Sequence, residues 1–418
     1  MSVQDDTGAL HSVGATGGPP RDRLLADPRA WGLMLAAMLT IMSNATITPA
    51  LPGLQAMFGD NPNAELLTRL LITAPSLLVA IVAPFAGVVV DRLGRRPPLF
   101  TGLIVYAIAG TAGLYLASLE AILASRLALG LGVAAIMTAQ AALIGDYFDG
   151  PARGRLMGYQ IAATNLGGLV FVMTAGVLAA HDPRLPFAIY ALSLVMIPFL
   201  WRVLPEPVAL SAGDRAAVAD PGEPGWPMTV AIMAAAPGLT FVIFYAVPTQ
   251  LPYHLAEIGL ADPRQTGEVM GTMMMAAAVM AVASGYLRPI LGRIGMPVIG
   301  YLSLTTGFIL LAMAQGLGMA MAGTALTGAG LGLVIPTFIT TALNAAPAHR
   351  RGLVSGLVTS AFFLGQFLSP LAMQPLIVHW GYATAFGIGA AGFALLALLL
   401  ILALRNRAAP VDNPAGAH

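Results

Sequence analysis

The 418-residue sequence contains no cysteine and no lysine, and it has few charges of any kind. Without cysteine it can form no disulfide, thiolate metal site or cysteine nucleophile. Charged residues make up 9% of the chain, against about 25% in an ordinary soluble domain. A surface so poor in charge cannot be hydrated over most of its area, so lipid must cover it. The net charge of +1 gives no basis for binding nucleic acid.

Long apolar runs dominate the chain, in which 57% of the residues are hydrophobic. A helix needs roughly 20 apolar residues to cross the hydrocarbon core of a bilayer. Runs of this kind fall near 31–52, 66–90, 98–118, 120–145, 155–180, 186–204, 228–252, 265–288, 296–316, 319–344, 352–378 and 381–404. The sequence therefore predicts an all-α membrane protein with about twelve transmembrane helices.

A polar stretch separates the first six runs from the last six. Residues 205–227 form the longest internal polar segment and are rich in Pro, Gly and Asp, so we interpret them as a linker. The linker divides the chain into two six-helix halves, 31–204 and 228–405, with polar tails at 1–30 and 406–418. The first run is too long for the core of a signal peptide, so we expect it to remain as the first span.

Arginine placement predicts the side of the membrane on which each loop lies. Sixteen of the twenty arginines fall in the tails, the linker and the loops of one side. The opposite side has three, Arg69, Arg184 and Arg264, and Arg126 lies within a span. Because basic loops stay in the cytoplasm, we expect both termini and the linker to be cytoplasmic in a bacterial inner membrane.

Glycines and arginines recur in the two halves at a constant offset of 198 residues, as in the pairing of Gly94 and Arg95 with Gly292 and Arg293. Further pairs are Gly102 with Gly300, Gly130 with Gly328, and Gly132 with Gly330. Six spans per half is an even number, so the halves share one orientation and form a parallel repeat. In such a design the substrate site lies between the repeats, near the midplane.

The loop between the second and third runs carries the most specific motif, Gly87-Val-Val-Val-Asp91-Arg92-Leu-Gly94-Arg95-Arg96. It closely resembles the signature loop of the major facilitator superfamily, G-x3-D-R-x-G-R-R. In that family the aspartate lies near the N-terminus of helix 11, where the helix dipole favours an anion, and the arginines reach an acid at the end of helix 4. The resemblance implies a cytoplasmic latch between the halves that favours the outward-facing state. The residues of this implied latch are Gly87, Asp91, Arg92, Gly94, Arg95, Arg96 and, as the helix 4 acid, Asp146. The alternative is that the arginines supply only the ordinary positive charge of loops on the inner side.

A second resemblance lies on the fourth run, where Ile122-x3-Arg126-x3-Gly130-x-Gly132 is similar to the family's helix 4 arginine motif. A charge near the bilayer centre costs on the order of 2.5–3.5 kcal/mol on insertion scales, so it usually faces a cavity or a partner. We interpret Arg126 as a residue of the substrate or proton pathway. The alternative is an arginine that snorkels to the membrane interface.

The end of the first run, from Ser43 to Pro52, resembles the drug-antiporter pattern L-D-x-T-x-x-x-A-L-P, with Asn44 in place of the acid. Asparagine cannot titrate or neutralise a cationic drug, but it can hydrogen-bond an uncharged solute. The antiporter motif of span 5 is also altered, since Phe171-Val172 replaces its Gly-Pro pair. The segment Leu204-Pro205-Glu206-Pro207 still resembles the exit to the linker in the drug-efflux branch.

None of the nineteen acids lies in the middle of a span, and neither does any histidine. Proton coupling would then depend on an interfacial acid such as Asp146 or Glu268, or be absent. Arg126 without a buried acid suits a neutral or anionic solute better than a cationic drug. The expected residues of the substrate and coupling pathway are Asn44, Arg126, Gln140, Asn165, Tyr245, Asn344 and Gln366.

These features predict a secondary active transporter that moves a small organic solute by alternating access, with export as the expected direction. The expected energy source is an ion gradient, normally of protons, and no cofactor or metal is implied. One alternative is an importer or uniporter of a small neutral or anionic metabolite. Another is a non-transporting assembly or sensor component on the same fold. No cluster of catalytic residues indicates an enzyme, and the resemblance implies a monomer.

Overall fold

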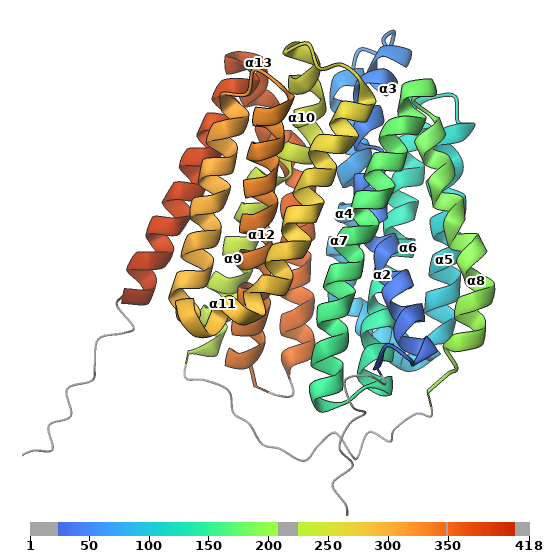
Figure 1. Cartoon of the computed structure of the whole chain (residues 1–418). Helices are drawn as coiled ribbons and strands as arrows, with labels where there is room; N and C mark the ends of the chain where they lie inside the picture. Colours follow the sequence, from blue (N-terminus) through green and yellow to red (C-terminus); the bar gives the residue numbers. More distant parts are fainter. Residues whose placement is uncertain (1–23, 208–224, 348–349, 406–418) are drawn as a thin grey trace, which may run out of the picture.

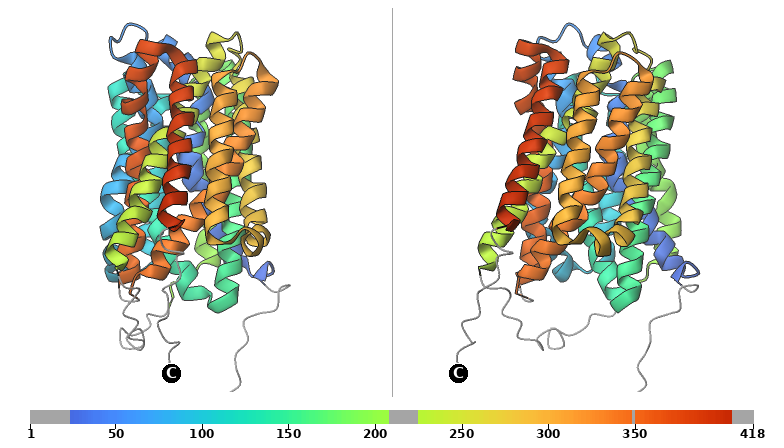
Figure 2. Two further views of the ribbon diagram at one scale, coloured as in Figure 1. Left: turned by 90° about the vertical axis from the view of Figure 1, so that its left-hand side faces the viewer. Right: turned by 60° about the vertical axis from the view of Figure 1, so that its left-hand side comes forward.

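The computed structural model describes residues 24–207, 225–347 and 350–405. Within these ranges the regular structure is helical. Figure 1 shows two bundles of roughly parallel helices side by side, the first half in blue to green and the second in yellow to red. Figure 2 shows from two other sides that the long helices share one general direction. Eleven helices of the described chain are long and apolar enough to cross a membrane.

The helices of the first half follow the predicted apolar runs closely. They are α2 (Pro28–Ala45), η1 (Thr48–Ala50), α3 (Leu51–Met57), α4 (Ala64–Leu93), α5 (Arg96–Thr111), η2 (Ala112–Leu114), α6 (Leu119–Tyr147), α7 (Gly150–His181), η3 (Leu185–Ala191) and α8 (Leu192–Val203). The first crossing is made by α2, η1 and α3 together, and the sixth by η3 and α8.

The second half has fewer and longer helices. They are α9 (Trp226–Phe244), α10 (Ala246–Glu257), α11 (Pro263–Ala312), α12 (Leu317–Ala345) and α13 (Arg351–Arg405). The backbone leaves helical geometry at Gly292 inside α11 and at Gly381 inside α13, with φ of 67° and 76°. The 55 residues of α13 would be roughly 80 Å long if straight, more than twice the hydrocarbon core. Both helices therefore turn back at their glycine and cross twice, which gives the twelve predicted crossings.

The two halves repeat the same backbone details at the offset of 198 residues. Gly94 has φ 85° and ψ 177°, and Gly292 has φ 67° and ψ −171°. A Cβ atom on Gly102 would lie 3.0 Å from the carbonyl oxygen of Gly132, and one on Gly300 would lie 3.0 Å from that of Gly330. The third and fourth crossings of each half therefore pack backbone to backbone through the matched glycines.

The halves meet along two seams, in which α4 packs on α13 and α7 packs on α11. In Figure 1, α2 begins, α8 ends, α9 begins and α13 ends at the same lower face. Residues 208–224, which make up most of the predicted linker, lie outside the described part of the chain. The seams leave a space between the halves at the level where α2 and α9 end.

Candidate functional site

A cavity of about 270 Å3 lies between the two halves and is lined by helices from both. It occurs where the first helix of each half is interrupted, because α2 ends at Ala45 and α9 passes into α10 at Tyr245. Discontinuous helices at the midplane are a common way to build transporter binding sites. Four of the residues expected from the sequence line this cavity: Asn44, Asn165, Tyr245 and Gln366.

Three of these side chains are linked to each other across the interface between the halves. The Nδ2 atom of Asn44 donates to the hydroxyl of Tyr245 at 3.2 Å and to Oε1 of Gln366 at 3.3 Å. The hydroxyl of Ser76 donates to the same oxygen of Gln366 at 2.7 Å. Since the Tyr245 hydroxyl accepts from Asn44, its own proton is left to donate to a solute. The fourth residue, Asn165, donates its amide N–H to the carbonyl of Ile161 in its own helix.

The rest of the cavity wall is apolar and deformable. Phe241, Phe244 and Phe363 supply aromatic surface, and Met273 and Met274 contribute flexible thioether side chains. None of the side chains that line this cavity is an acid, an arginine or a histidine. The cavity therefore combines apolar surface with neutral amide and hydroxyl groups.

The other expected pathway residues lie elsewhere. Gln140 is buried and donates to the carbonyl of Leu33, so it ties α6 to α2 inside the first half. Asn344 is exposed near the end of α12. Arg126 is fully buried within the first half. None of these three lines the cavity, and a role for them in transport stays a prediction.

Arg126 is held by backbone and aromatic groups. Its Nε donates to the carbonyl of Leu71 at 3.0 Å, and its Nη2 donates to the carbonyl of Ser43 and, at 3.0 Å, to the hydroxyl of Tyr190. The guanidinium also lies 4.9 Å from the centre of the Tyr190 ring. Because Ser43 precedes Asn44, Arg126 fixes the backbone that presents Asn44 to the cavity. Its guanidinium therefore lies behind this segment, buried inside the first half.

The signature loop is fastened at the end of the first half. Gly94 has a positive φ that favours glycine. The carboxylate of Glu206 accepts the backbone N–H of Arg95 at 2.6 Å and that of Arg96 at 2.9 Å. The side chain of Arg95 donates to Asp146 at 2.7 Å, which is the ion pair that the motif implies. We did not expect Glu206 to bind the signature loop, although it belongs to the Leu-Pro-Glu-Pro segment that resembles the family's exit to the linker.

The remaining latch residues are placed as follows. The guanidinium carbon of Arg96 lies 4.3 Å from the centre of the Trp201 ring, and Nη2 of Arg96 donates to the carbonyl of Trp201 at 2.9 Å. Arg92 is exposed, and Gly87 has open space around its Cα atom. The side chain of Asp91 lies outside the described part of the chain. Its contact with the helix that begins at Arg351 therefore stays a prediction.

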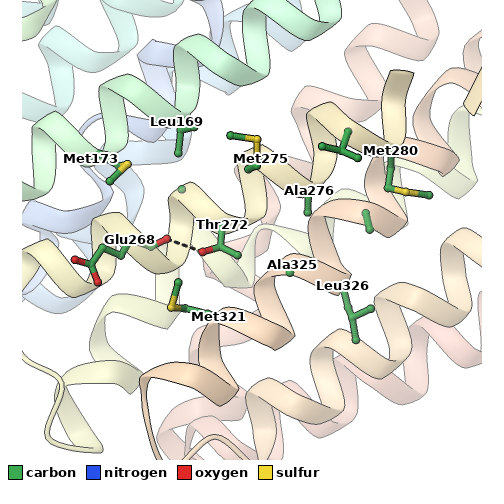
Figure 3. A pocket seen from close by; sticks show the side chains of 13 residues that line it. Leu169, Met173, Glu268, Thr272, Met275, Ala276, Met280, Met321, Ala325 and Leu326 are labelled. Carbon is green, nitrogen blue, oxygen red and sulfur yellow. Dashed lines mark hydrogen bonds between the residues drawn. The ribbon is translucent and has the colours of Figure 1, made fainter. Parts of the chain in front are cut away.

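A second, larger hollow of about 620 Å3 lies between α7, α11 and α12 (Figure 3). Its wall includes Leu169, Met275 and Met321, and Glu268 supplies a carboxylate at one end. Glu268 and Met275 are both exposed in the described structure. Glu268, one of the two acids considered for proton coupling, therefore faces the outside of the bundle and does not line the central cavity.

Comparison with known proteins decides the family. The family model described as Major Facilitator Superfamily matches residues 33–370 and 261–418. The chain belongs to the Major Facilitator Superfamily. It is therefore a multi-pass membrane transporter and not an enzyme.

Relatives of this superfamily member carry out different kinds of transport. The multidrug efflux protein YfmO of Bacillus subtilis is 24% identical over 392 residues, which cover 92% of this chain and 95% of that protein. The niacin transporter NiaP of Acinetobacter baylyi is 24% identical over 178 residues, or 42% of this chain and 37% of that protein. Their names alone do not fix the solute or its direction here.

Solved structures show the same fold. The partially occluded inward-open form of the xylose transporter XylE of E. coli superposes with a TM-score of 0.72 at 15% identity, over 95% of this chain and all of that one. The human organic anion transporter MFSD10 superposes with a TM-score of 0.68 at 20% identity, over 91% of this chain and all of that one. At these identities the likeness concerns the fold alone.

Proposed function

We propose that this facilitator-superfamily protein exports a small, uncharged organic solute across a bacterial inner membrane. The observation that carries the proposal is the cavity between the halves, in which Asn44, Tyr245 and Gln366 are the linked polar groups and no charged side chain is present. Its volume of about 270 Å3 is close to the lower end of the about 300–1,000 Å3 usual for small-molecule sites. An uncharged molecule with one or two hydrogen-bonding groups suits such a site.

The uncharged cavity wall disfavours a cationic solute. Moving an ion from water into a site without a counter-charge costs several kcal/mol, and Arg126 places positive charge behind the wall next to Asn44. Export as the direction is supported by the likeness to the multidrug efflux protein, which extends over nearly the whole chain. We take the signature-loop side as cytoplasmic because the basic loops lie there, and a proton gradient as the energy source.

The test uses bacteria that lack their own broad-specificity efflux pumps. Cells that express the protein are loaded with an uncharged fluorescent solute, and its loss is followed over time. We expect faster loss from these cells than from cells that express the Gln366→Leu variant at equal abundance. Equal retention in the two strains, for a panel of uncharged solutes, would contradict the proposed export.

A second candidate is a uniporter that lets an uncharged solute equilibrate. It is favoured by the cavity wall, which contains no acid or histidine that could bind a coupling proton as access alternates. An uncoupler distinguishes the two, because it stops export against a solute gradient and leaves downhill movement by a uniporter unchanged.

A further inference from the structure

Arg69 is almost completely buried, at 1% exposure, although it lies near the start of α4. Its guanidinium contacts residues of the second half. The Nε atom donates to Oε1 of Gln250 at 2.7 Å, and Nη2 donates to the hydroxyl of Tyr382 at 3.2 Å. The guanidinium also lies 4.1 Å from the centre of the Tyr253 ring. In its own half it pairs with Glu65, 3.4 Å away.

The partners of Arg69 are themselves connected across the interface. The Nε2 atom of Gln374 donates to the carboxylate of Glu65, and Nε2 of Gln250 donates to Oε1 of Gln374 at 3.3 Å. The hydroxyls of Thr68 and Tyr253 are 3.1 Å apart. These side chains form one cluster, here called the Arg69 cluster, which ties α4 of the first half to α10 and α13 of the second.

The Arg69 cluster lies at the end of α4 opposite the signature loop. Twenty-five residues separate Arg69 from Gly94, which corresponds to roughly 37 Å along a helix. The central cavity lies between these two ends, because Ser76 on the same helix bonds to Gln366. The cluster therefore closes the cavity on the side away from the signature loop.

A line of polar residues leads from the cavity to the cluster along the seam between α4 and α13. The contacts of Ser360 with Ala80 and of Ser76 with Gln366 set the register of the two antiparallel helices. This register places Thr73 level with Ser369, one turn beyond the cavity. Both hydroxyls are fully buried and have no hydrogen-bond partner within the described part of the chain. Buried hydroxyls are normally hydrogen-bonded, so this pair marks a place for water or for a polar group of a passing solute.

We propose that Arg69 is the gate residue on the side opposite the signature loop. Solute passes between the cavity and that side along Thr73 and Ser369 only after Arg69 has released Gln250 and Tyr382. Water replaces the broken hydrogen bonds when the halves separate, so opening exchanges one set of partners for another and stays reversible. The proposal requires only that the protein transports by moving its halves, and it holds for either direction and any solute.

The experiment measures the separation of the halves at this end without any solute. The chain has no cysteine, so the exposed residues Asp60 and Ala261, in the loops before α4 and before α11, can be replaced by cysteine and spin-labelled in the full-length protein. Pulsed electron–electron double resonance in nanodiscs then gives the distribution of distances between the spin labels on the two halves. We expect Arg69→Gln to raise the long-distance fraction at least threefold, and Gln250→Glu to lower it because a carboxylate holds Arg69 more strongly.

Arg184→Gln is the matched control. Arg184 is on the same side, but its partners are the carbonyls of Gly113, Leu114 and Leu116 in its own half. We expect its distance distribution to equal that of the unchanged protein. If Arg69→Gln is not recovered folded, Tyr382→Phe replaces it. This substitution removes only one acceptor of Arg69 and should raise the long-distance fraction about twofold. Distributions for the Arg69 and Tyr382 variants that match the Arg184→Gln control would overturn the proposal.

Discussion

The amide nitrogen of Asn44 donates to the hydroxyl of Tyr245 at 3.2 Å, and this bond joins the two halves at the central cavity. Asn44 comes just before the end of α2, and Tyr245 stands between α9 and α10. The interruptions of the first helix in each half therefore meet at one polar contact. Any motion that separates the halves at this level must change the groups presented to a solute.

Tyr245→Phe tests whether this contact belongs to the solute site. The substitution removes the acceptor for Asn44 and the hydroxyl proton available to a solute, and a hydrogen bond contributes about 0.5–1.5 kcal/mol. We expect KM for an uncharged solute to rise about 3- to 10-fold in proteoliposomes, with little change in thermal stability. An unchanged KM would show that solute does not contact Tyr245.

Asn44→Asp tests the role of charge in selectivity. A carboxylate at this position gives the cavity a counter-ion, so we expect transport of a monovalent aromatic cation to increase at least tenfold at neutral pH. The gain should decline as pH falls, because protonation removes the negative charge. Asn344→Asp adds the same charge at an exposed position outside the cavity and should leave cation transport unchanged. Equal gains in the two variants would mean that the effect is not local to the cavity.

Arg126→Gln should act mainly on stability. The substitution leaves buried carbonyls of Leu71 and Ser43 without their donor, at about 1–3 kcal/mol for each unsatisfied group. We expect a lower melting temperature in detergent, measured by tryptophan fluorescence, whereas Arg264→Gln at an exposed site should have no effect. Normal stability with abolished transport would instead place Arg126 in the transport pathway.

Gly330→Val tests the backbone packing that the two halves share. A Cβ atom on Gly330 would lie 2.5 Å from the carbonyl oxygen of Gly300, and overpacking of this kind costs typically about 1–3 kcal/mol. We expect a clear loss of thermal stability. Gly158→Val introduces the same side chain where no atom lies within 4 Å and should be tolerated. Similar melting temperatures for the two variants would contradict the close glycine packing.

The number of crossings and the repeat could be predicted because they depend on local features of the sequence. Apolar runs of membrane length define the crossings, and paired glycines such as Gly94 and Gly292 mark turns that need a positive φ. Four polar residues that the apolar runs made candidates, Asn44, Asn165, Tyr245 and Gln366, line the central cavity, and their role in transport stays a prediction. The prediction failed to separate these from Gln140, because polarity alone does not tell whether a helix face points to a cavity or to a neighbouring helix.

The Arg69 cluster could not be predicted from the sequence. Arg69 lies near the end of a span, where an arginine usually extends to the interface. Its partners Gln250 and Tyr382 are 181 and 313 residues away in the chain. Only the assembled halves bring them together.

The most direct test of whether the central cavity takes uncharged solutes compares two solutes of equal shape, an uncharged aromatic amide and its quaternary ammonium analogue. Each is presented to proteoliposomes that contain the protein, and its flux is measured with the Gln366→Leu variant as the reference. We expect the uncharged solute to be moved at least ten times more efficiently, in kcat/KM, than the cation, and Gln366→Leu to lower its flux. Equal or better transport of the cation would contradict the assignment of the central cavity to uncharged solutes.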